Sequence, residues 1–330
     1  MIVIVNNPAF LDVADVAAAL GARFLTPGAP GAAVDMHAVL GLPLDGDGSL
    51  EQRLFAAVRG RVRALREGGQ RDIVVAGVFH EPEPLARLRR LLSDLDDVIY
   101  AFRPRYDRDD LARSGDLGDG ELGDLLDLFD QWLAAQRQGA RRGDMGFEIV
   151  VDRFDANAAA AAIWDDIHEP VELSEHDLDW PARFAEERDR IAAILGERAL
   201  SVEHIGSTAV PELPAKPIID ILVAVDDLAR DAAPCLAPLS TLGYAFIDYP
   251  QNTDRRFFRK GKPRSHHIQL VEEDGAAARA YLAFRDALRA DASLRQEYAA
   301  LKRAAQAELG HDRAGFGARK SELVRRVLAG

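Results

Sequence analysis

The sequence predicts a two-domain α/β protein in which a parallel-sheet domain is followed by an α+β domain. The chain has 330 residues, more than one ordinary hydrophobic core holds, and this length favours two domains. Its first half alternates short, continuously apolar runs with helical patterns, as in a parallel sheet covered by helices. Its second half groups several strand patterns and then ends in helices, an order typical of α+β domains.

In the first half, apolar runs and helical spacing alternate element by element. Leu54, Val58, Val62 and Leu65 recur at helical spacing, and Ser49 is placed to cap the helix that carries them. The expected strands are 2–5, 72–78, 98–102 and 147–151, and the expected helices are 13–20, 49–67, 84–92, 120–137 and 158–167. The helical pattern stops at Ile167-His-Glu-Pro170, which predicts domains at 1–167 and 168–330.

The second half opens with a helix at 178–195, whose apolar stripe ends before Gly196. An alternating strand at 200–205 runs into Gly206-Ser207, and the next strand, 218–225, is interrupted only by Asp220. A hairpin follows, with a cation-rich strand from 255 and a return strand at 266–271. Helices are expected at 277–290 and 293–309.

The overall composition predicts a soluble, cytoplasmic protein with a small-molecule or protein partner. The chain has a single cysteine, Cys235, no apolar run of about 18 residues that could cross a bilayer, and an N-terminus without a basic leader region. Its net charge of -13 argues against binding to nucleic acid or to an anionic membrane, because both need a cationic surface. The sequence leaves the oligomeric state open.

The strand-turn-helix layout at the start resembles P-loop small-molecule kinases across residues 1–165. The phosphate-binding loop itself is lost, because the segment Asn6–Val13 contains neither the glycines nor the lysine that such a loop needs. The resemblance therefore implies a kinase-like fold without kinase chemistry, serving as a scaffold or as a regulatory or substrate-recognition module.

A set of motifs runs through residues 171–330. They are Trp180 with Phe184 and Glu187, the segment EHIGSTAVPELPAKPIIDI, Gly243-Tyr244, the run 256–260, His266-His267, the segment 282–286, Tyr298, Leu301, Lys302 and Lys320. Together they resemble the GrpB-like (UPF0157) family, which is assigned by prediction to the nucleotidyltransferase superfamily. The resemblance implies a site that binds a nucleoside triphosphate, with ATP the expected nucleotide, together with Mg²⁺.

The segment from Gly206 to Asp220 is the expected centre of that site. Gly206 lets the backbone approach a phosphate, and Ser207 and Thr208 offer hydroxyl groups. A carboxylate within an apolar strand needs a partner, so Asp220 is expected to bind the metal, with an ion pair to Lys216 or to an arginine as the alternative.

Two positions depart from the patterns that the resemblance implies. The superfamily places a second carboxylate two residues after the first, where this chain has Leu222, so Glu203 on the neighbouring strand is the candidate second metal ligand. The family usually has glycine at Glu212, and the glutamate is expected to add a negative charge near the phosphates.

The hairpin adds cations and histidines to the expected site. Six cations fall within residues 255–264, and Arg256, Arg259 and Lys260 are candidates for binding the triphosphate. Pairing of these cations with the acidic surface of the protein itself is the open alternative. His267 is a candidate catalytic residue that shares a strand face with Gln269, where the family has a second histidine.

Three functions remain open from the sequence. The leading one is transfer of a nucleotidyl group from a nucleoside triphosphate with Mg²⁺ to a small-molecule acceptor. The second is a catalytically degenerate nucleotide- or metabolite-binding protein or scaffold. The third is an ATP-dependent ligase-type biosynthetic enzyme.

Overall fold

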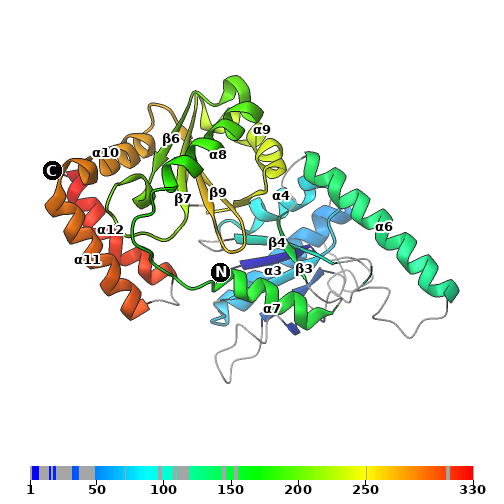
Figure 1. Cartoon of the computed structure of the whole chain (residues 1–330). Coiled ribbons are helices and arrows are strands. Elements are labelled where there is room, and N and C mark those ends of the chain that lie inside the picture. Colours follow the sequence, from blue (N-terminus) through cyan, green and yellow to red (C-terminus); the bar gives the residue numbers. More distant parts are fainter. Residues whose placement is uncertain are drawn as a thin grey trace. The chain divides into compact units, whose positions relative to one another are not determined.

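The computed structural model describes two compact units (Figure 1). The described residues are 2–6, 15, 18–19, 32–36, 49–70, 72–95, 99–106, 109, 119–142, 146–151, 155–249, 251–309 and 313–329. The first unit comprises Met1–Asp165 with Ala245–Gln251, and the second comprises Asp166–Tyr244 with Asn252–Gly330. The predicted helix at 13–20 falls largely on residues outside those described.

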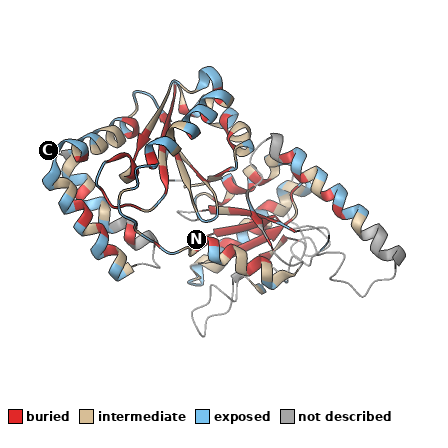
Figure 2. Cartoon of the chain, in the orientation of Figure 1, coloured by how far each residue is buried: buried red, intermediate tan, exposed pale blue. Residues whose placement is uncertain are grey.

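The first unit is built on a five-stranded sheet whose strand pairs are all parallel, in the order β2-β3-β1-β4-β5. The strands are β1 (Ile2–Asn6), β2 (Ala32–Asp35), β3 (Ile73–Gly77), β4 (Ile99–Arg105) and β5 (Phe147–Val150), and the helices are α3 (Leu50–Glu67), α4 (Pro82–Leu92), α6 (Asp119–Arg142) and α7 (Ala156–Ile167). Every residue of β1 and β3 is buried, which is why both read as continuous apolar runs (Figure 2).

Helices α3 and α4 pack their apolar stripes on the sheet in one core. The predicted cap of α3 is confirmed: the Ser49 side chain accepts a hydrogen bond from the Gln52 N–H, and the Gln52 side chain accepts one from the Ser49 N–H. At the carboxyl end of β1, the buried side chains of Asn6 and Gln136 bind each other and the backbone of Phe79. Of the segment predicted to replace a phosphate loop, only Asn6 is described, and its side chain is occupied by this network.

The second unit contains most of a mixed five-stranded sheet in the order β6-β7-β10-β9-β8; Ala245–Ile247 of β8 are the part of this sheet that belongs to the first unit. Its strands are β6 (Ser201–Ile205), β7 (Ile219–Val225), β8 (Tyr244–Ile247), β9 (Arg255–Lys260) and β10 (His266–Glu272), and its helices are α8 (Trp180–Leu195), α9 (Leu228–Thr241), α10 (Ala276–Ala290), α11 (Ala292–Leu309) and α12 (Arg313–Ala329), with short 3-10 turns η1 (Gly196–Arg198) and η2 (Ser207–Ala209). β7 runs antiparallel to β6 and parallel to β10, and β10 runs antiparallel to β9. A parallel sheet in the first unit and a mixed sheet with helices in the second confirm the predicted α/β class.

Strand register divides the second sheet into two faces. Ile205, Asp220, His267 and Arg259 are paired in register across β6, β7, β10 and β9, so their side chains share one face. α10 covers this face through a core that includes Leu222. The opposite face carries His204, Arg256, Lys260 and His266, where α8 packs, and Figure 1 shows α10, α11 and α12 together on one side of the sheet.

Three elements that form or follow the second sheet, α9, α12 and β8, are absent from the sequence prediction, and each has a local reason. α9 contains Pro234 and Pro238, which ordinarily argue against a helix interior. α12 begins with Gly315 and Gly317 in its first turns, and glycine lowers helix propensity. β8 has only four residues, too short for a clear alternation. In the first unit, the four-residue strand β2 is absent from the prediction for the same reason.

Candidate functional site

Gly206 is required by Asp220 rather than by a ligand directly. Its backbone has φ 69° and ψ -169°, a region open essentially to glycine alone. A Cβ atom at this position would lie 2.4 Å from Oδ2 and 2.8 Å from Cβ of Asp220. The glycine therefore allows the turn after β6 to pass directly against the carboxylate on β7.

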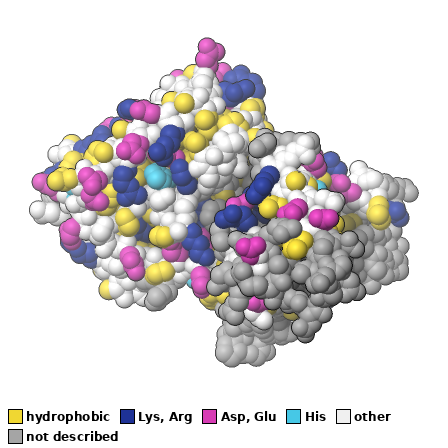
Figure 3. All heavy atoms as spheres, turned by 45° about the vertical axis from the view of Figure 1, so that its right-hand side comes forward, with side chains coloured by type: hydrophobic (Ala, Val, Ile, Leu, Met, Phe, Trp, Pro, Cys, Tyr) yellow, Lys and Arg dark blue, Asp and Glu magenta, His cyan; other side chains and the backbone are white. Residues whose placement is uncertain are grey.

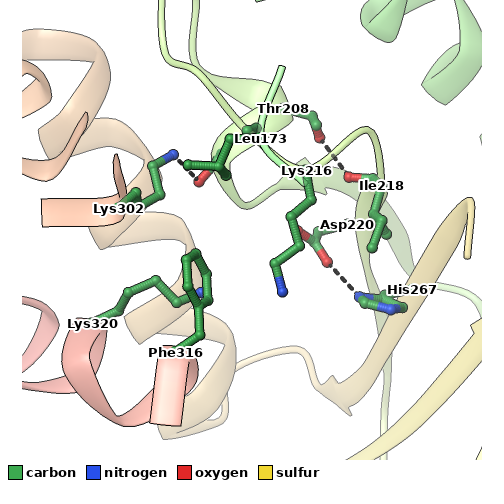
Figure 4. A pocket seen from close by; sticks show the side chains of 11 residues that line it. Leu173, Thr208, Lys216, Ile218, Asp220, His267, Lys302, Phe316 and Lys320 are labelled. Carbon is green, nitrogen blue, oxygen red and sulfur yellow. Dashed lines mark hydrogen bonds and ion pairs between the residues drawn. The ribbon is translucent and has the colours of Figure 1, made fainter. Parts of the chain in front are cut away.

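The side chain of Asp220 lines a small cavity of about 130 Å³ within the second unit (Figure 4). The lining residues come from β7, β10, the turn after β6, the segment before β7, and helices α11 and α12. They are Leu173, Ser207, Thr208, Ala215, Lys216, Ile218, Asp220, His267, Lys302, Phe316 and Lys320. The predicted residues Ser207, Thr208, Lys216, Asp220 and His267 are thus brought together around one space.

Three lysines face this cavity, and two of them lie outside the predicted site. The Lys302 ammonium donates to Oγ of Ser207 at 3.0 Å and to the carbonyl of Pro214. Lys216 and Lys320 lie over the ring of Phe316, with Nζ 4.6 and 4.9 Å from its centroid. Lys302 and Lys320 belong to the motifs that resemble the GrpB-like family, and only five of the chain's 41 Lys and Arg residues are lysines; these are the two sequence signals for both residues.

Burial changes the proton affinity of these ammonium groups. Burial, reinforced by repulsion from Lys320, lowers the pKa of Lys302 to about 7. Burial also lowers the pKa of Lys320, against the attraction of Asp220. An anion bound in the cavity would raise these lowered pKa values again and so keep the lysines protonated.

His267 holds the carboxylate of Asp220 in place. Its Nδ1 lies 3.0 Å from Oδ1 of Asp220, so the Nδ1–H donates, while Nε2 is enclosed without a hydrogen-bond partner in the described part of the chain. Burial lowers the pKa of His267, against its hydrogen bond to Asp220. The neutral imidazole with its proton on Nδ1 fits both observations.

Thr208 is engaged with protein groups and does not offer its hydroxyl freely. Its Oγ1 donates to the carbonyl of Ile218 at 3.2 Å and accepts from Nε2 of His204 at 3.0 Å. The His204 ring stacks on Phe184 with centroids 4.6 Å apart, and burial lowers its pKa to about 4. The two hydrogen bonds of Thr208 connect the turn after β6 to His204 in β6 and to Ile218, the residue that precedes β7.

The candidate second metal ligand lies elsewhere. Glu203 accepts a hydrogen bond from Arg285 at 2.8 Å and is not among the residues lining the cavity. Leu222 is buried in the core beneath α10. Among the described residues, no group of three His, Cys, Asp or Glu side chains is arranged to hold a metal ion.

Glu212 has a backbone φ of 64°, which explains why glycine suits this position. Its side chain is 80% exposed and contacts Arg295 at 3.4 Å. Glu212 does not line the cavity that contains Asp220. The Glu212 carboxylate, which was expected to add a negative charge near the phosphates, therefore lies outside this cavity.

The hairpin cations bind groups of the protein itself, but Arg259 and Lys260 pair with buried carboxylates rather than with the acidic surface that was left open as the alternative. Arg259 is 1% exposed and forms an ion pair with the equally buried carboxylate of Asp166. Lys260 binds the buried Glu187 at 2.7 Å, and Arg256 donates to the carbonyls of Asn252 and Arg255, each on the face opposite Asp220. None of the three lines the cavity.

On the face that Figure 3 presents, Lys and Arg side chains lie among Asp and Glu side chains rather than in one continuous cationic patch. In the described part of the chain, no helix combines the length and hydropathy needed to cross a membrane.

Comparisons with known proteins place the second half of the chain in a family. The family model described as "GrpB protein" matches residues 170–329. A UPF0157 protein of Halalkalibacterium halodurans is 37% identical over 159 residues, which cover 48% of this chain and 80% of that protein. A UPF0157 protein of Pseudomonas aeruginosa is 40% identical over 163 residues, covering 48% of this chain and 66% of that protein.

Two further matches are partial or structural. A dephospho-CoA kinase of Mycolicibacterium paratuberculosis is 32% identical over 163 residues, covering 42% of this chain and 40% of that protein. The crystal structure of GrpB from Enterococcus faecalis is 31% identical, covers 48% of this chain and 98% of that chain, and superposes with a TM-score of 0.44. Through residues 170–329, the chain belongs to the GrpB (UPF0157) family.

Proposed function

We propose that the second unit binds a nucleoside triphosphate with Mg²⁺ and transfers its nucleotidyl group to a small-molecule acceptor. The observation that carries this proposal is the cavity in which Asp220 faces three lysines. A carboxylate beside several cations suits a ligand that is itself a metal-bound polyanion.

The donors present fit Mg²⁺ only if the substrate brings ligands of its own. Magnesium is commonly bound by one or two carboxylates together with substrate phosphates and water. Asp220 would be the protein carboxylate, and the hydrogen bond from Nδ1 of His267 would orient it. Mg²⁺ bound there would supply charge neutralisation to the phosphates.

The remaining roles belong to the lysines and to the acceptor. In the proposed transfer, the acceptor oxygen forms a bond to the α-phosphorus, and the bond from that phosphorus to the oxygen bridging the α- and β-phosphates breaks. Pyrophosphate leaves, and the acceptor proton passes to solvent. Lys216, Lys302 and Lys320 would offset the charge that builds on the leaving pyrophosphate.

One observation favours a second candidate, a nucleotide- or metabolite-binding protein without transfer activity. Leu222 is packed in the core, and Glu203 is held by Arg285. The cavity therefore has a single carboxylate, whereas transferases that use two metal ions hold them with several carboxylates. In either case the first unit would serve as a kinase-like scaffold or recognition module, with Asn6 and Gln136 engaged with the backbone of Phe79.

Calorimetry of the full chain with ATP, GTP, CTP and UTP in Mg²⁺, followed by release of pyrophosphate, tests the proposal. We expect binding of at least one nucleotide, and loss of metal-dependent binding in Asp220→Asn, which keeps the shape but removes the charge. Glu203→Gln is the matched control, because its carboxylate lies outside the cavity. With a mixture of small-molecule acceptors supplied, binding without pyrophosphate release would select the second candidate. No binding by any nucleotide would refute the transferase and the nucleotide-binding form of the second candidate, and would leave only the binding of another metabolite.

A further inference from the structure

Lysine is rare in this chain, and its few positions are concentrated at one place. The five lysines are Lys216, Lys260, Lys262, Lys302 and Lys320, against 36 arginines. Three of the five line the cavity that contains Asp220. Outside the cavity the chain has two lysines and 36 arginines, whereas the cavity is lined by three lysines and no arginine.

The dimensions of the cavity favour lysine over arginine. A space of about 130 Å³ is smaller than the roughly 300–1,000 Å³ of pockets that enclose a whole small molecule. It is nevertheless large enough for several waters or one phosphate-sized group. An ammonium is a compact point charge with three donors, whereas a planar guanidinium would fill much of this space.

The three ammonium groups surround the cavity from different elements. Lys302 reaches it from α11, Lys320 from α12, and Lys216 from the segment before β7, with Lys216 and Lys320 both placed over the ring of Phe316 (Figure 4). Among the described residues, the Lys320 ammonium contacts the ring of Phe316, and no hydrogen bond or ion pair occupies its N–H donors. Its ammonium is therefore available to a ligand.

Such an arrangement costs folding free energy unless a ligand is bound. Burial lowers the pKa values of both Lys302 and Lys320, and repulsion from Lys320 lowers that of Lys302 further, so keeping these ammonium groups charged in the cavity costs free energy. Asp220 is the only acidic residue among the lining residues. The cavity thus has an excess of positive charge that a tetrahedral oxyanion would balance.

We propose that this cavity is a seat for a single phosphate-sized oxyanion, built by Lys216, Lys302 and Lys320, and that it is occupied without a metal ion. The inference rests on the proposed function for the nature of the ligand, a phosphate group of a nucleotide or of its pyrophosphate product. Because the cavity takes only the phosphate end, the nucleoside lies outside it, and this site does not select the base.

The rarity of lysine makes a direct test practicable. Full-length protein labelled with ¹³C-lysine gives five ε-methylene signals, and single Lys→Arg variants assign them. Inorganic pyrophosphate is added in the presence of a chelator, with ionic strength held constant by chloride. We expect saturable shifts for Lys216, Lys302 and Lys320 and none for Lys260 and Lys262. Orthophosphate and ATP form separate arms, and both should compete with pyrophosphate.

Variants give a second readout. Loss of a charge-assisted contact in Lys320→Met should weaken pyrophosphate binding about tenfold or more. Lys320→Arg should fail to restore it, because charge alone is not sufficient in so small a space. Lys262→Met and Lys262→Arg are the matched controls and should leave affinity unchanged. Thermal unfolding checks that each variant folds.

The outcomes separate this inference from the proposed function. Equal shifts of all five lysines would indicate diffuse screening and overturn the seat, as would the absence of any shift. Restoration of binding by Lys320→Arg would overturn the requirement for lysine. If nucleotide turnover occurs without pyrophosphate shifts in the chelator, the seat fails and the proposed function stands. If the shifts occur but no nucleotide is turned over, the seat stands and the transferase fails.

Discussion

Substitution of Gly206 by alanine tests the link between the turn after β6 and the carboxylate of Asp220. The backbone at Gly206 lies in a region that costs a non-glycine residue about 1–3 kcal/mol. The added Cβ would also lie 2.4 Å from Oδ2 of Asp220, so the carboxylate must leave its rotamer, at about 0.5–1.5 kcal/mol. Loss of its hydrogen bond from His267 adds about 1 kcal/mol.

Gly196→Ala is the matched control for the backbone cost. Gly196 lies in the same unit with φ 57° and ψ -136°, and a Cβ there would meet nothing within 4 Å. We expect Gly196→Ala to destabilise the unit by about 1–2 kcal/mol and Gly206→Ala by about 2 kcal/mol more. Only Gly206→Ala should weaken nucleotide binding.

The assay has to report on one unit, because a chain of two units need not unfold in a single transition. Hydrogen exchange at increasing urea, resolved on peptides from β6 and β7, isolates the second unit. Equal destabilisation by the two substitutions would refute the steric argument, and unchanged nucleotide binding in Gly206→Ala would refute the role of the turn in holding Asp220.

Three further predictions follow from the same contacts. Arg259→Gln should lower the unfolding free energy of the second unit, measured in urea, by about 3–5 kcal/mol, because the buried carboxylate of Asp166 loses its partner. Arg256→Gln should lower it by about 0.5 kcal/mol or less. Similar costs for the two substitutions would mean that the buried ion pair does not stabilise the fold. Glu212→Gly should stabilise the unit by about 0.5–1 kcal/mol, because it relieves a positive φ, and a fall in Tm would contradict this reasoning. Burial and repulsion from Lys320 lower the pKa of Lys302 to about 7. Pyrophosphate affinity should therefore fall from about pH 6 to pH 8, because Lys302 loses its proton in the unbound protein, and binding near pH 7 should take up a proton. Calorimetry in buffers of different ionisation enthalpy measures the affinity and the proton uptake, and an affinity that does not change with pH would contradict the assignment. The other charged groups that act on this ammonium are Lys216, Asp220 and Arg303.

Local sequence patterns predicted the carboxylate of the candidate site well. Asp220 was identifiable because a single charge interrupts an otherwise apolar strand. The turn at Gly206 was identifiable because the strand pattern ends there. Both features are set by residues close in sequence, and the strand register then places His267 beside Asp220.

The cationic part of the site depended on contacts that sequence order does not reveal. The hairpin concentrates charge in ten residues, but Arg259 finds its partner Asp166 93 positions away in the chain. The cavity instead takes its cations from α11 and α12, and α12 carries glycines that weaken its helical pattern. Charge density along the sequence was therefore a poorer guide than the identity of the cation, since lysine is scarce and three of five lysines meet in the cavity.

The position of a bound metal and its nucleotide tests the central claim most directly. A crystal structure of the full chain with Mn²⁺ and a non-hydrolysable ATP analogue gives an anomalous peak that locates the ion. We predict the peak within about 2.2 Å of a carboxylate oxygen of Asp220, with a phosphate among Lys216, Lys302 and Lys320. Nucleotide bound elsewhere, with no ion at Asp220 and no phosphate in the cavity, would contradict the account.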